Sequence, residues 1–426
     1  MSSYILGPGY RAISQSELPD QWSAKRLGDF VTVSQGGKLG LTKESDYVSN
    51  GIPAYSAAGQ DGFVDRAEFR DQAGVVLSAI GANCGRCFYA DGDWTTLANV
   101  QAILPSKELN ARFLYYRANI ENYWTRSGSA QPFIKPSSVK TSWIAFPDLA
   151  RQRRIAEILS TLDEAIEQTE ALIAKHQQIK AGLMHDLFTR GVTPDGHLRP
   201  TREQAPDLYK ESPLGWIPKE WEVKPLADFT QHDITYGIVQ AGPHVENGVP
   251  YIRTGDMAGD TLIKDELLCT SRTIANSYKR SEVRVGEIVC AIRATVGKVL
   301  RVPPDLDGAN LTQGTARIAP SASTNATFLL WAIRTERTQR TIMSSIKGTT
   351  FSEITLGDLR KLPVAAPSNK DEQKLIGVRL EQGDNMIRAE SALLTKLRQQ
   401  KHGLMHDLLT CRVRVPVAET EKGGTS

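Results

Sequence analysis

Two stretches of the chain repeat apolar residues with the alternating four-three spacing of a heptad. The first runs from Ile155 to Leu187 and the second from Ile376 to Leu408, and most positions in phase hold Ile or Leu. Such a stripe predicts an amphipathic helix of about five heptads whose apolar side is buried. The two stripes therefore predict two long helices that bury each other as a coiled coil. A helix over residues 152–189 would be about 57 Å long.

The remaining segments alternate short apolar runs with glycine and proline. Runs such as GVVLSAI and EIVCAIRATVGKVL indicate strands and turns. Short helices are expected around residues 113–122 and 328–338. After the first long helix comes a proline-rich segment without periodicity, which predicts a connector. The pattern as a whole predicts α+β domains joined to long helices.

The hexapeptide GLMHDL occurs near the end of both predicted long helices, at 182–187 and 403–408. Further matches follow in the same order along both halves, and the offset between them rises from about 199 to about 221 residues. Among them are LPDQWSAKRLGDF with IPKEWEVKPLADF, AGVVLSAIGANCG with VGEIVCAIRATVG, SGSAQPFI with KGTTFSEI, and Gln152 with Gln373. An ordered series of this kind indicates an internal duplication.

Each copy of the hexapeptide places a glycine inside a predicted helix. Gly182 and Gly403 each cost such a helix about 1 kcal/mol relative to alanine. We therefore expect a close backbone approach at this point in both copies, from the other helix or from a partner protein.

The duplication divides the chain into two similar domains and two long helices, related by a pseudo-two-fold internal repeat. We predict a first domain at 1–147, a first helix at 148–190 and a connector at 191–216. A second domain at 217–367, a second helix at 368–412 and a disordered tail at 413–426 complete the prediction.

Composition limits the class of protein more than it identifies the function. The chain has 426 residues, 40% hydrophobic and 23% charged, as in a globular protein of two or three domains. A net charge of +3 does not establish a polyanionic partner but allows a local basic surface. The odd number of cysteines fits a reducing compartment, and neither a long apolar run nor a signal peptide is present. We expect a cytoplasmic protein without membrane segments.

The sequence lacks a convincing catalytic or metal-binding motif. ATVGKVL resembles a phosphate loop, but Ile292 and Val299 occupy the positions that require glycine and Ser or Thr. Cys84 and Cys87 form a CxxC pair that aligns with valines in the second copy, which favours a packing role over a metal site. The repeated histidines of GLMHDL, at helical spacing beside Leu and Met, are expected to pack at an interface. We therefore expect a protein that is not itself an enzyme.

Several motifs together resemble the specificity subunits of type I restriction-modification systems. They are GWIPKEW, the glycine-bounded strand pair ending in IRATVGKV, KGTTFSEI, Pro367 followed by DEQKLIGVRL, and both copies of GLMHDL. Each motif is short and degenerate, but their order and their duplication over nearly the whole chain carry the similarity. In that family, two target-recognition domains are joined by two conserved helices packed as an antiparallel coiled coil.

The resemblance implies a DNA-recognition role. Each target-recognition domain would read one half of a split double-stranded DNA site. The helices would set the gap and dock two modification (methyltransferase) subunits, with restriction subunits completing the complex. S-adenosylmethionine, ATP and Mg would then be bound by the partner subunits, and no cofactor or metal by this chain.

Candidate DNA contacts are polar and basic residues on predicted loops, because phosphates attract cations and base edges need hydrogen-bonding groups. In the first domain they are Gln35, Lys38, Lys43, Tyr55, Ser56, Asn83, Arg86, Arg126 and Lys135. In the second domain they are Tyr236, Gln240, Arg253, Arg293, Thr295, Lys298, Asn310, Gln313, Lys347 and Thr349. Arg86 and Lys298 are favoured, since both follow the equivalent glycine. Candidate docking residues are Met184, His185, Met405 and His406.

Two alternatives remain open from the sequence. The chain would serve equally well in a methylation-only or type IIB-like assembly, because the nuclease would lie elsewhere. From a different class, a coiled-coil scaffold with two protein-binding domains would show neither DNA affinity nor a steep salt dependence.

Overall fold

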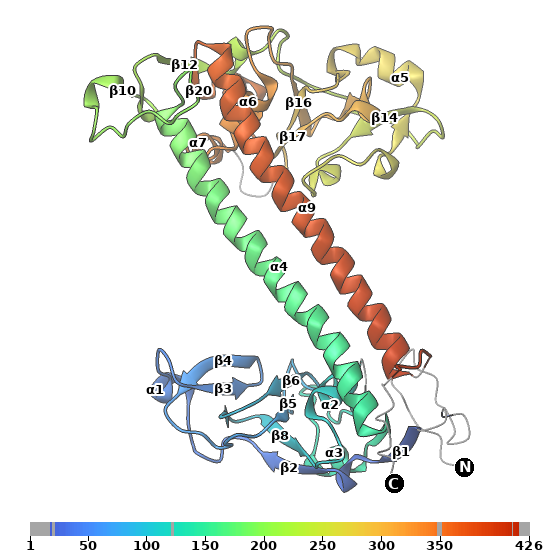
Figure 1. Cartoon of the computed structure of the whole chain (residues 1–426). Coiled ribbons are helices and arrows are strands. Elements are labelled where there is room, and N and C mark those ends of the chain that lie inside the picture. The colour runs from blue at the N-terminus through green and yellow to red at the C-terminus, as the bar shows by residue number, and fades with distance from the viewer. Residues whose placement is uncertain (1–17, 19–21, 121–122, 347–351, 411, 417–426) are drawn as a thin grey trace, which may run out of the picture. The chain divides into compact units, whose positions relative to one another are not determined.

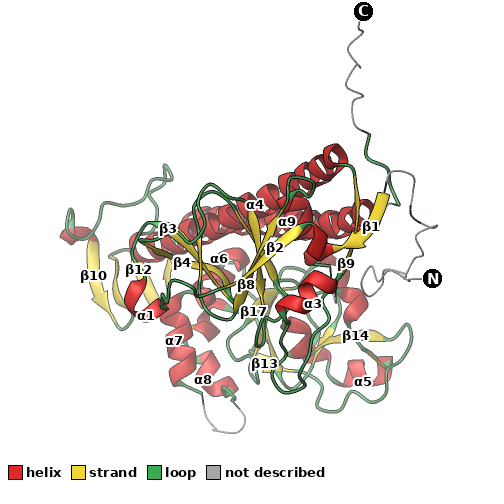
Figure 2. Cartoon of the chain, turned by 90° about the horizontal axis from the view of Figure 1, so that it is seen from below, coloured by secondary structure: helices red, strands yellow, loops and turns green. Residues whose placement is uncertain are grey.

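The computed structural model describes residues 18, 22–120, 123–346, 352–410 and 412–416. Its contacts divide the chain into two compact units, which we call unit one (1–170 with 392–426) and unit two (171–391). Loops, drawn green in Figure 2, make up much of the chain outside the long helices. None of the described helices is long and apolar enough to cross a membrane.

Two long helices, α4 (Leu149–Arg190) and α9 (Lys370–Leu409), contribute one segment each to both units. Within each unit the two segments run antiparallel, because ion pairs join rising residue numbers on α4 to falling numbers on α9 (Figure 1). The pairs are Asp163–Lys401 and Glu170–Arg398 in unit one and Lys180–Asp384 in unit two, where His176 also lies within hydrogen-bonding distance of Glu390. Every position of the two predicted apolar stripes is buried or half-buried. The predicted antiparallel coiled coil is confirmed.

The described residues of unit one form three sheets. The four-stranded sheet has the order β2-β8-β5-β6, with strands Val31–Gln35, Val100–Pro105, Gly74–Ser78 and Cys87–Ala90. A three-stranded sheet, β4-β3-β7 (Gly59–Val64, Ile52–Ser56, Thr95–Thr96), includes a parallel pair, β3 with β7. Strand β1 (Trp22–Arg26) pairs with β9 (Trp143–Pro147). Helices α1 (Lys43–Asp46), α2 (Ala111–Ala118) and α3 (Pro136–Thr141) connect them.

Unit two repeats this architecture strand for strand. Its four-stranded sheet is β13-β19-β16-β17, with strands Thr235–Tyr236, Thr315–Ile318, Ile288–Ala291 and Val299–Arg301. Its three-stranded sheet, β15-β14-β18 (Cys269–Thr270, Val249–Ile252, Asn310–Leu311), again has a parallel pair. Strand β12 (Trp221–Pro225) pairs with β20 (Pro363–Pro367). Its helices are α5 (Arg272–Ser277), α6 (Ala326–Arg334), α7 (Glu336–Ser344) and α8 (Leu356–Arg360).

One glutamine in each copy ties the start of a long helix to its domain. The carboxamide oxygen of Gln152 accepts from the backbone N–H of Asn110 at 2.8 Å, and that of Gln373 accepts from Asn325 at 2.8 Å. Each carboxamide also donates to a proline carbonyl, Pro147 at 2.9 Å or Pro367 at 3.0 Å. Both side chains are buried. The predicted pairing of Gln152 with Gln373 is therefore confirmed by two equivalent hydrogen bonds.

The duplicated strands align with one correction. In unit one the N–H of Gly85 donates to the carbonyl of Ser78 at 2.8 Å, whereas in unit two Gly297 donates to Ala291 at 2.9 Å. The glycine thus lies seven residues after its partner in the first copy and six in the second (85 − 78 and 297 − 291). The loop that ends at Gly297 is therefore one residue shorter than the loop that ends at Gly85. The ungapped alignment of AGVVLSAIGANCG with VGEIVCAIRATVG is wrong by one residue within the strands.

The connector is more ordered than its sequence suggests. Strands β10 (Tyr209–Ser212) and β11 (Gly215–Pro218) form a hairpin. Upstream of it, the guanidinium of Arg199 donates to both carboxylate oxygens of Glu372 at 2.6 and 3.0 Å. The Glu372 carboxylate also accepts from Trp221 Nε1 at 3.1 Å and from the Val192 N–H at 3.0 Å. A buried ion pair thus fastens the connector to the start of α9.

Three further predictions need correction. No described atom lies within 4 Å of a Cβ built on Gly182 or Gly403, outside the glycine's immediate surroundings in its own helix. The described residues of this chain therefore do not make the expected backbone approach, and approach by a partner protein stays a prediction. Helix α2 ends at Ala118, earlier than expected, because Asn119 leaves the helical conformation, with a φ of −94° and a ψ of 5°. Val415, which we assigned to the tail, is buried in the core of unit one.

Candidate DNA interface

Several of the candidate residues gather at one edge of each four-stranded sheet. In unit one, β8 is antiparallel to both β2 and β5, so β2 and β5 end at the same edge. Gln35 is the last residue of β2, and the loop after β5 carries Asn83 and Arg86. The sheet topology therefore brings together residues that are about fifty positions apart in the sequence.

A second loop joins this edge. The N–H of Gly81 donates to the carbonyl of Pro132 at 3.0 Å, and Ile134 donates to Ala79 at 2.9 Å. The segment carrying Arg126 and Lys135 is thereby held beside the loop after β5. Lys38, Arg86, Arg126 and Lys135 are all exposed. Together they give unit one a basic rim that could face phosphates.

Unit two builds the same edge with the same backbone hydrogen bonds. Ala294 donates to Ser352 at 3.2 Å, and Ile354 donates to Ile292 at 3.0 Å. Thr295 is exposed on this loop. The ammonium of Lys298 donates to the carbonyl of Ala258 at 2.8 Å. Lys347 and Thr349 lie outside the described residues.

A shallow pocket of about 300 Å³ opens at this edge of unit two. Arg253, Arg293 and Gln313 line it together with Ile238, Val239, Ala241, Thr254, Thr312 and Gly314. The guanidinium of Arg253 donates to Asp256 at 2.6 and 3.1 Å, and that of Arg293 donates to Glu353 at 3.1 Å. Sequence reasoning missed both carboxylates. Asp256 was detectable at three residues from Arg253, whereas Glu353 is brought in only by the fold.

Other candidates are engaged inside their domains. Ser56 is buried and donates to Asp61 at 2.6 Å, and the Lys43 ammonium pairs with the same carboxylate. Asn310 is buried and accepts from Ser281 at 2.5 Å. The Tyr55 hydroxyl donates to the carbonyl of Tyr89 at 3.1 Å. These side chains hold their sheets in shape, and we assign no base contact to Ser56 or Asn310.

Two candidates at the strand ends occupy equivalent positions. Gln35 pairs with Gln101 on β8, and Tyr236 pairs with Ala316 on β19, at the matching step of each sheet. Gln35 is exposed and Tyr236 is half-buried, while Gln240 is exposed on the loop that follows.

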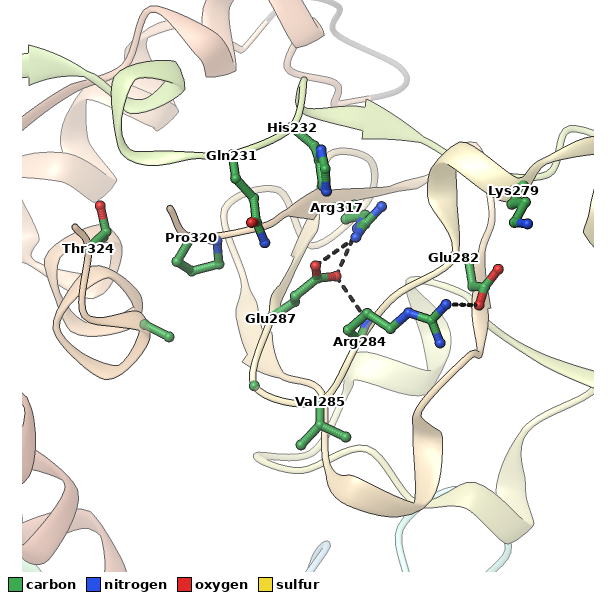
Figure 3. Close-up of a pocket in the computed structure, with 12 residues that line it drawn as sticks. Gln231, His232, Lys279, Glu282, Arg284, Val285, Glu287, Arg317, Pro320 and Thr324 are labelled. Atoms are coloured by element: carbon green, nitrogen blue, oxygen red, sulfur yellow. Dashed lines mark hydrogen bonds and ion pairs between the residues drawn. The ribbon is translucent and has the colours of Figure 1, made fainter. Parts of the chain in front are cut away.

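The opposite edge of the sheet in unit two has a different character. A depression of about 480 Å³ lies there, and Figure 3 shows its charged lining. Arg317 donates to both oxygens of the buried Glu287 at 2.7 and 2.8 Å, and Arg284 lies 2.7 Å from Glu282. Because these arginines are neutralised by neighbouring carboxylates, this edge is a poor surface for phosphate.

The two cysteines of the CxxC pair lie inside the core of unit one. Cys84 and Cys87 are each 3% exposed, and the equivalent Val296 and Val299 are equally buried. Burial raises the pKa of Cys87 to about 12 and also raises that of Cys84. Thiols held in the protonated form are poor metal ligands. No group of three or more His, Cys, Asp or Glu suited to a metal occurs among the described residues.

The hexapeptide residues lie differently from one another. Met184 packs partly buried against the core of unit two, and Met405 does so against the core of unit one. His185 is exposed, whereas His406 is half-buried. In unit two a pocket of about 510 Å³ adjoins Met184 and His185, lined by α6, α7 and β20.

Comparison with known proteins identifies the family. Residues 19–177 and 218–399 match the family model described as the type I restriction modification DNA specificity domain. The chain belongs to this family of specificity subunits. It is therefore a DNA-recognition subunit and not an enzyme.

Two relatives of the specificity subunit match more than nine tenths of its length. It is 23% identical to the type I restriction enzyme MjaVIII specificity subunit of Methanocaldococcus jannaschii, over 93% of this chain and 94% of the relative. It is 25% identical to the putative type I restriction enzyme MjaX specificity subunit of the same organism, over 94% and 95%. The crystal structure of the S subunit from a type I restriction-modification system of M. genitalium has a TM-score of 0.64 at 16% identity, covering 92% and 97%. The fold is thus shared at low sequence identity.

Proposed function

We propose that this specificity subunit directs a type I restriction-modification complex to a split DNA site, each unit reading one half. The observation that carries the proposal is the repeated sheet edge. Both copies share the backbone hydrogen bonds that hold the edge but differ in the side chains exposed there. Two readers with one framework and different contacts would recognise two different short sequences.

The basic rim supplies the sequence-independent part of binding. Exposed Lys38, Arg86, Arg126 and Lys135 on unit one would contact phosphates. Each phosphate contact releases counterions, so affinity would fall steeply as salt is raised. A coiled-coil scaffold without DNA affinity would show no such dependence.

The long helices would dock two modification subunits and set the gap between the half-sites. Gly182 and Gly403 support this role, because each weakens its helix while no described atom of the chain uses the space beside it. A partner helix could approach closely at both positions. The modification subunits would bind S-adenosylmethionine, and restriction subunits would contribute ATP- and Mg-dependent cleavage. A methylation-only assembly would use the same surfaces without the restriction subunits.

The recognition role is tested by genome-wide methylation mapping in a methylation-free host. The chain is co-expressed with the methyltransferase encoded beside it, and the methyltransferase alone is the control. We expect a split methylated motif that appears only when the chain is present. A soluble assembled complex that leaves no motif would refute the proposal.

The docking role is tested at the open glycines. Gly182→Arg and Gly403→Arg add bulk on the open side of each helix, and we expect them together to abolish co-purification of the methyltransferase. Gly182→Ala with Gly403→Ala is the matched control for loss of glycine and should weaken binding far less. Unchanged co-purification of the arginine variant would contradict docking at this surface.

A further inference from the structure

The internal duplication allows a position-by-position comparison of the two sheet edges. The N–H of Leu97 donates to Tyr55 at 2.8 Å in unit one, and Thr312 donates to Ile252 at 3.1 Å in unit two. Ser56 and Arg253 follow these acceptors directly, so they occupy equivalent positions.

Two more equivalences follow from the same network. Ala79 donates to Asn99, and Ile292 donates to Gly314, each at 2.9 Å. The residues before these acceptors are Ala98 and Gln313, which are therefore equivalent. Each unit also has an isolated bridge at this edge. It joins Ile80 to Phe133 in unit one and Arg293 to Glu353 in unit two, so Ile80 and Arg293 are equivalent.

The pocket of unit two thus has two arginines and a glutamine where unit one has Ser56, Ile80 and Ala98. Ser56 is buried and Ile80 is an exposed apolar side chain. The same framework therefore presents cationic, planar hydrogen-bond donors in one unit and none at the matching positions of the other.

Both arginines are oriented by carboxylates. Asp256 accepts from Nε and Nη2 of Arg253, and its side chain is only 7% exposed. This leaves both hydrogens of Nη1 and one of Nη2 available for an end-on contact. Arg293 is held through Nη2 by Glu353, and its Nε is buried without a hydrogen-bond partner among the described atoms.

Such pairs favour base edges over phosphates. A neighbouring carboxylate cancels most of the attraction between a guanidinium and the polyanionic backbone, while it fixes the plane of the donors. Two parallel N–H groups match the O6 and N7 acceptors of guanine, which is the commonest specific contact of arginine in the major groove. Ala294, next to Arg293, has a φ of 58°, a left-handed conformation that a residue with a Cβ keeps only where the surrounding structure holds it.

We propose that Arg253 and Arg293 each read a guanine in the half-site recognised by unit two. Unit one, with Ser56 and Ile80 at the matching positions, makes no equivalent guanine contact there. The inference rests on the proposed recognition function and assigns a base to two residues of one unit.

The test compares methylated motifs of the wild-type chain with those of Arg253→Lys and Arg293→Lys, co-expressed with the methyltransferase. Lysine keeps the charge needed for a phosphate contact but loses the planar fork. Arg340→Lys, an exposed arginine on α7 of the same unit, is the control. We expect each pocket variant to lose about 5- to 150-fold of its preference at one guanine position. Both affected positions should lie in the same half-site, while the other half-site and the control motif stay unchanged.

A binding assay keeps the test decisive if a variant methylates poorly. Oligonucleotides that carry 7-deazaguanine at the assigned positions lack the N7 acceptor. They should bind the wild-type complex more weakly than the natural site, and the loss should be smaller for the matching lysine variant, which lacks the planar fork.

Three results would overturn the inference: a wild-type motif without two guanines in one half-site, lysine variants whose motif is unchanged, or equal weakening of both proteins by 7-deazaguanine. Absence of any motif from the wild-type complex would instead refute the recognition function itself.

Discussion

Removing the Glu372 carboxylate should destabilise unit two more than any surface change. The side chains of Arg199 and Glu372 are 9% and 8% exposed, and the hydrogen bonds of Glu372 raise the pKa of Arg199 above its ordinary value. Glu372→Ala leaves the Arg199 cation without its buried partner and also removes the acceptor of the fully buried Trp221 indole N–H. Breaking a buried pair from one side costs about 3 to 5 kcal/mol.

A second carboxylate, Glu220, affects how much stability the Glu372→Ala variant loses. It also pairs with Arg199 at 3.0 Å, but its side chain is 78% exposed, so it compensates only weakly. We therefore expect a loss of about 4 kcal/mol, against a total stability of about 5 to 15 kcal/mol for a typical domain.

The assay is urea unfolding of the purified chain, combined with amide hydrogen exchange. Protection of the Val192 N–H, which donates to Glu372, should fall together with the free energy of unfolding. Arg151→Ala is the matched control. Arg151 stands directly before Gln152, as Glu372 stands directly before Gln373, and the ion pair of Arg151 with Asp148 is more exposed. The control should cost less than about 1 kcal/mol.

A double variant shows whether the lost stability comes from an unpaired buried charge or from lost packing. Arg199→Met with Glu372→Met replaces the pair by apolar side chains, and such replacements of buried pairs are often neutral or stabilising. Recovery of most of the stability lost in Glu372→Ala is expected. A loss below about 1 kcal/mol in Glu372→Ala, the level of an exposed pair, would refute the argument.

Three further outcomes follow from the packing. Gly182→Ala and Gly403→Ala should each raise the free energy of unfolding by up to about 1 kcal/mol in urea titrations, because the added Cβ meets open space; destabilisation would reveal a contact that the structure lacks. Gln373→Ala should cost about 1 to 3 kcal/mol in the same assay, since the part-buried N–H of Asn325 loses its acceptor. At pH 8, iodoacetamide should label the half-buried Cys269 well before Cys87, whose pKa is about 12, as followed by peptide mass spectrometry; equal labelling rates would argue against burial of Cys87.

The sequence predicted the long helices and the duplication correctly because both rest on periodic or repeated patterns. Heptad spacing fixes which face of a helix is buried, whatever the rest of the chain does. The repeat of Gln152 and Gln373 likewise survives as equivalent hydrogen bonds. These features needed no knowledge of distant contacts.

The sheet edges and the connector were harder to predict. Ser56 was a plausible base contact until the fold placed Asp61 beside it. Arg199 was one of many charged residues in a proline-rich segment, and its partner Glu372 lies 173 residues away. Such pairings depend on tertiary geometry, which local patterns do not encode. The one-residue difference between the duplicated loops was hidden by the matching glycines at 85 and 297.

The backbone network at the sheet edges also has an evolutionary consequence. Its hydrogen bonds run between main-chain groups, so they do not depend on which side chains project from the rim. Substitutions of exposed residues away from special features usually change stability by less than about 0.5 kcal/mol. A lineage can therefore explore new target sequences at the rim with little risk to folding. Because the chain holds two such sheet edges, one can change its DNA preference while the other keeps the original one. New combinations of half-sites then arise by changing one edge at a time.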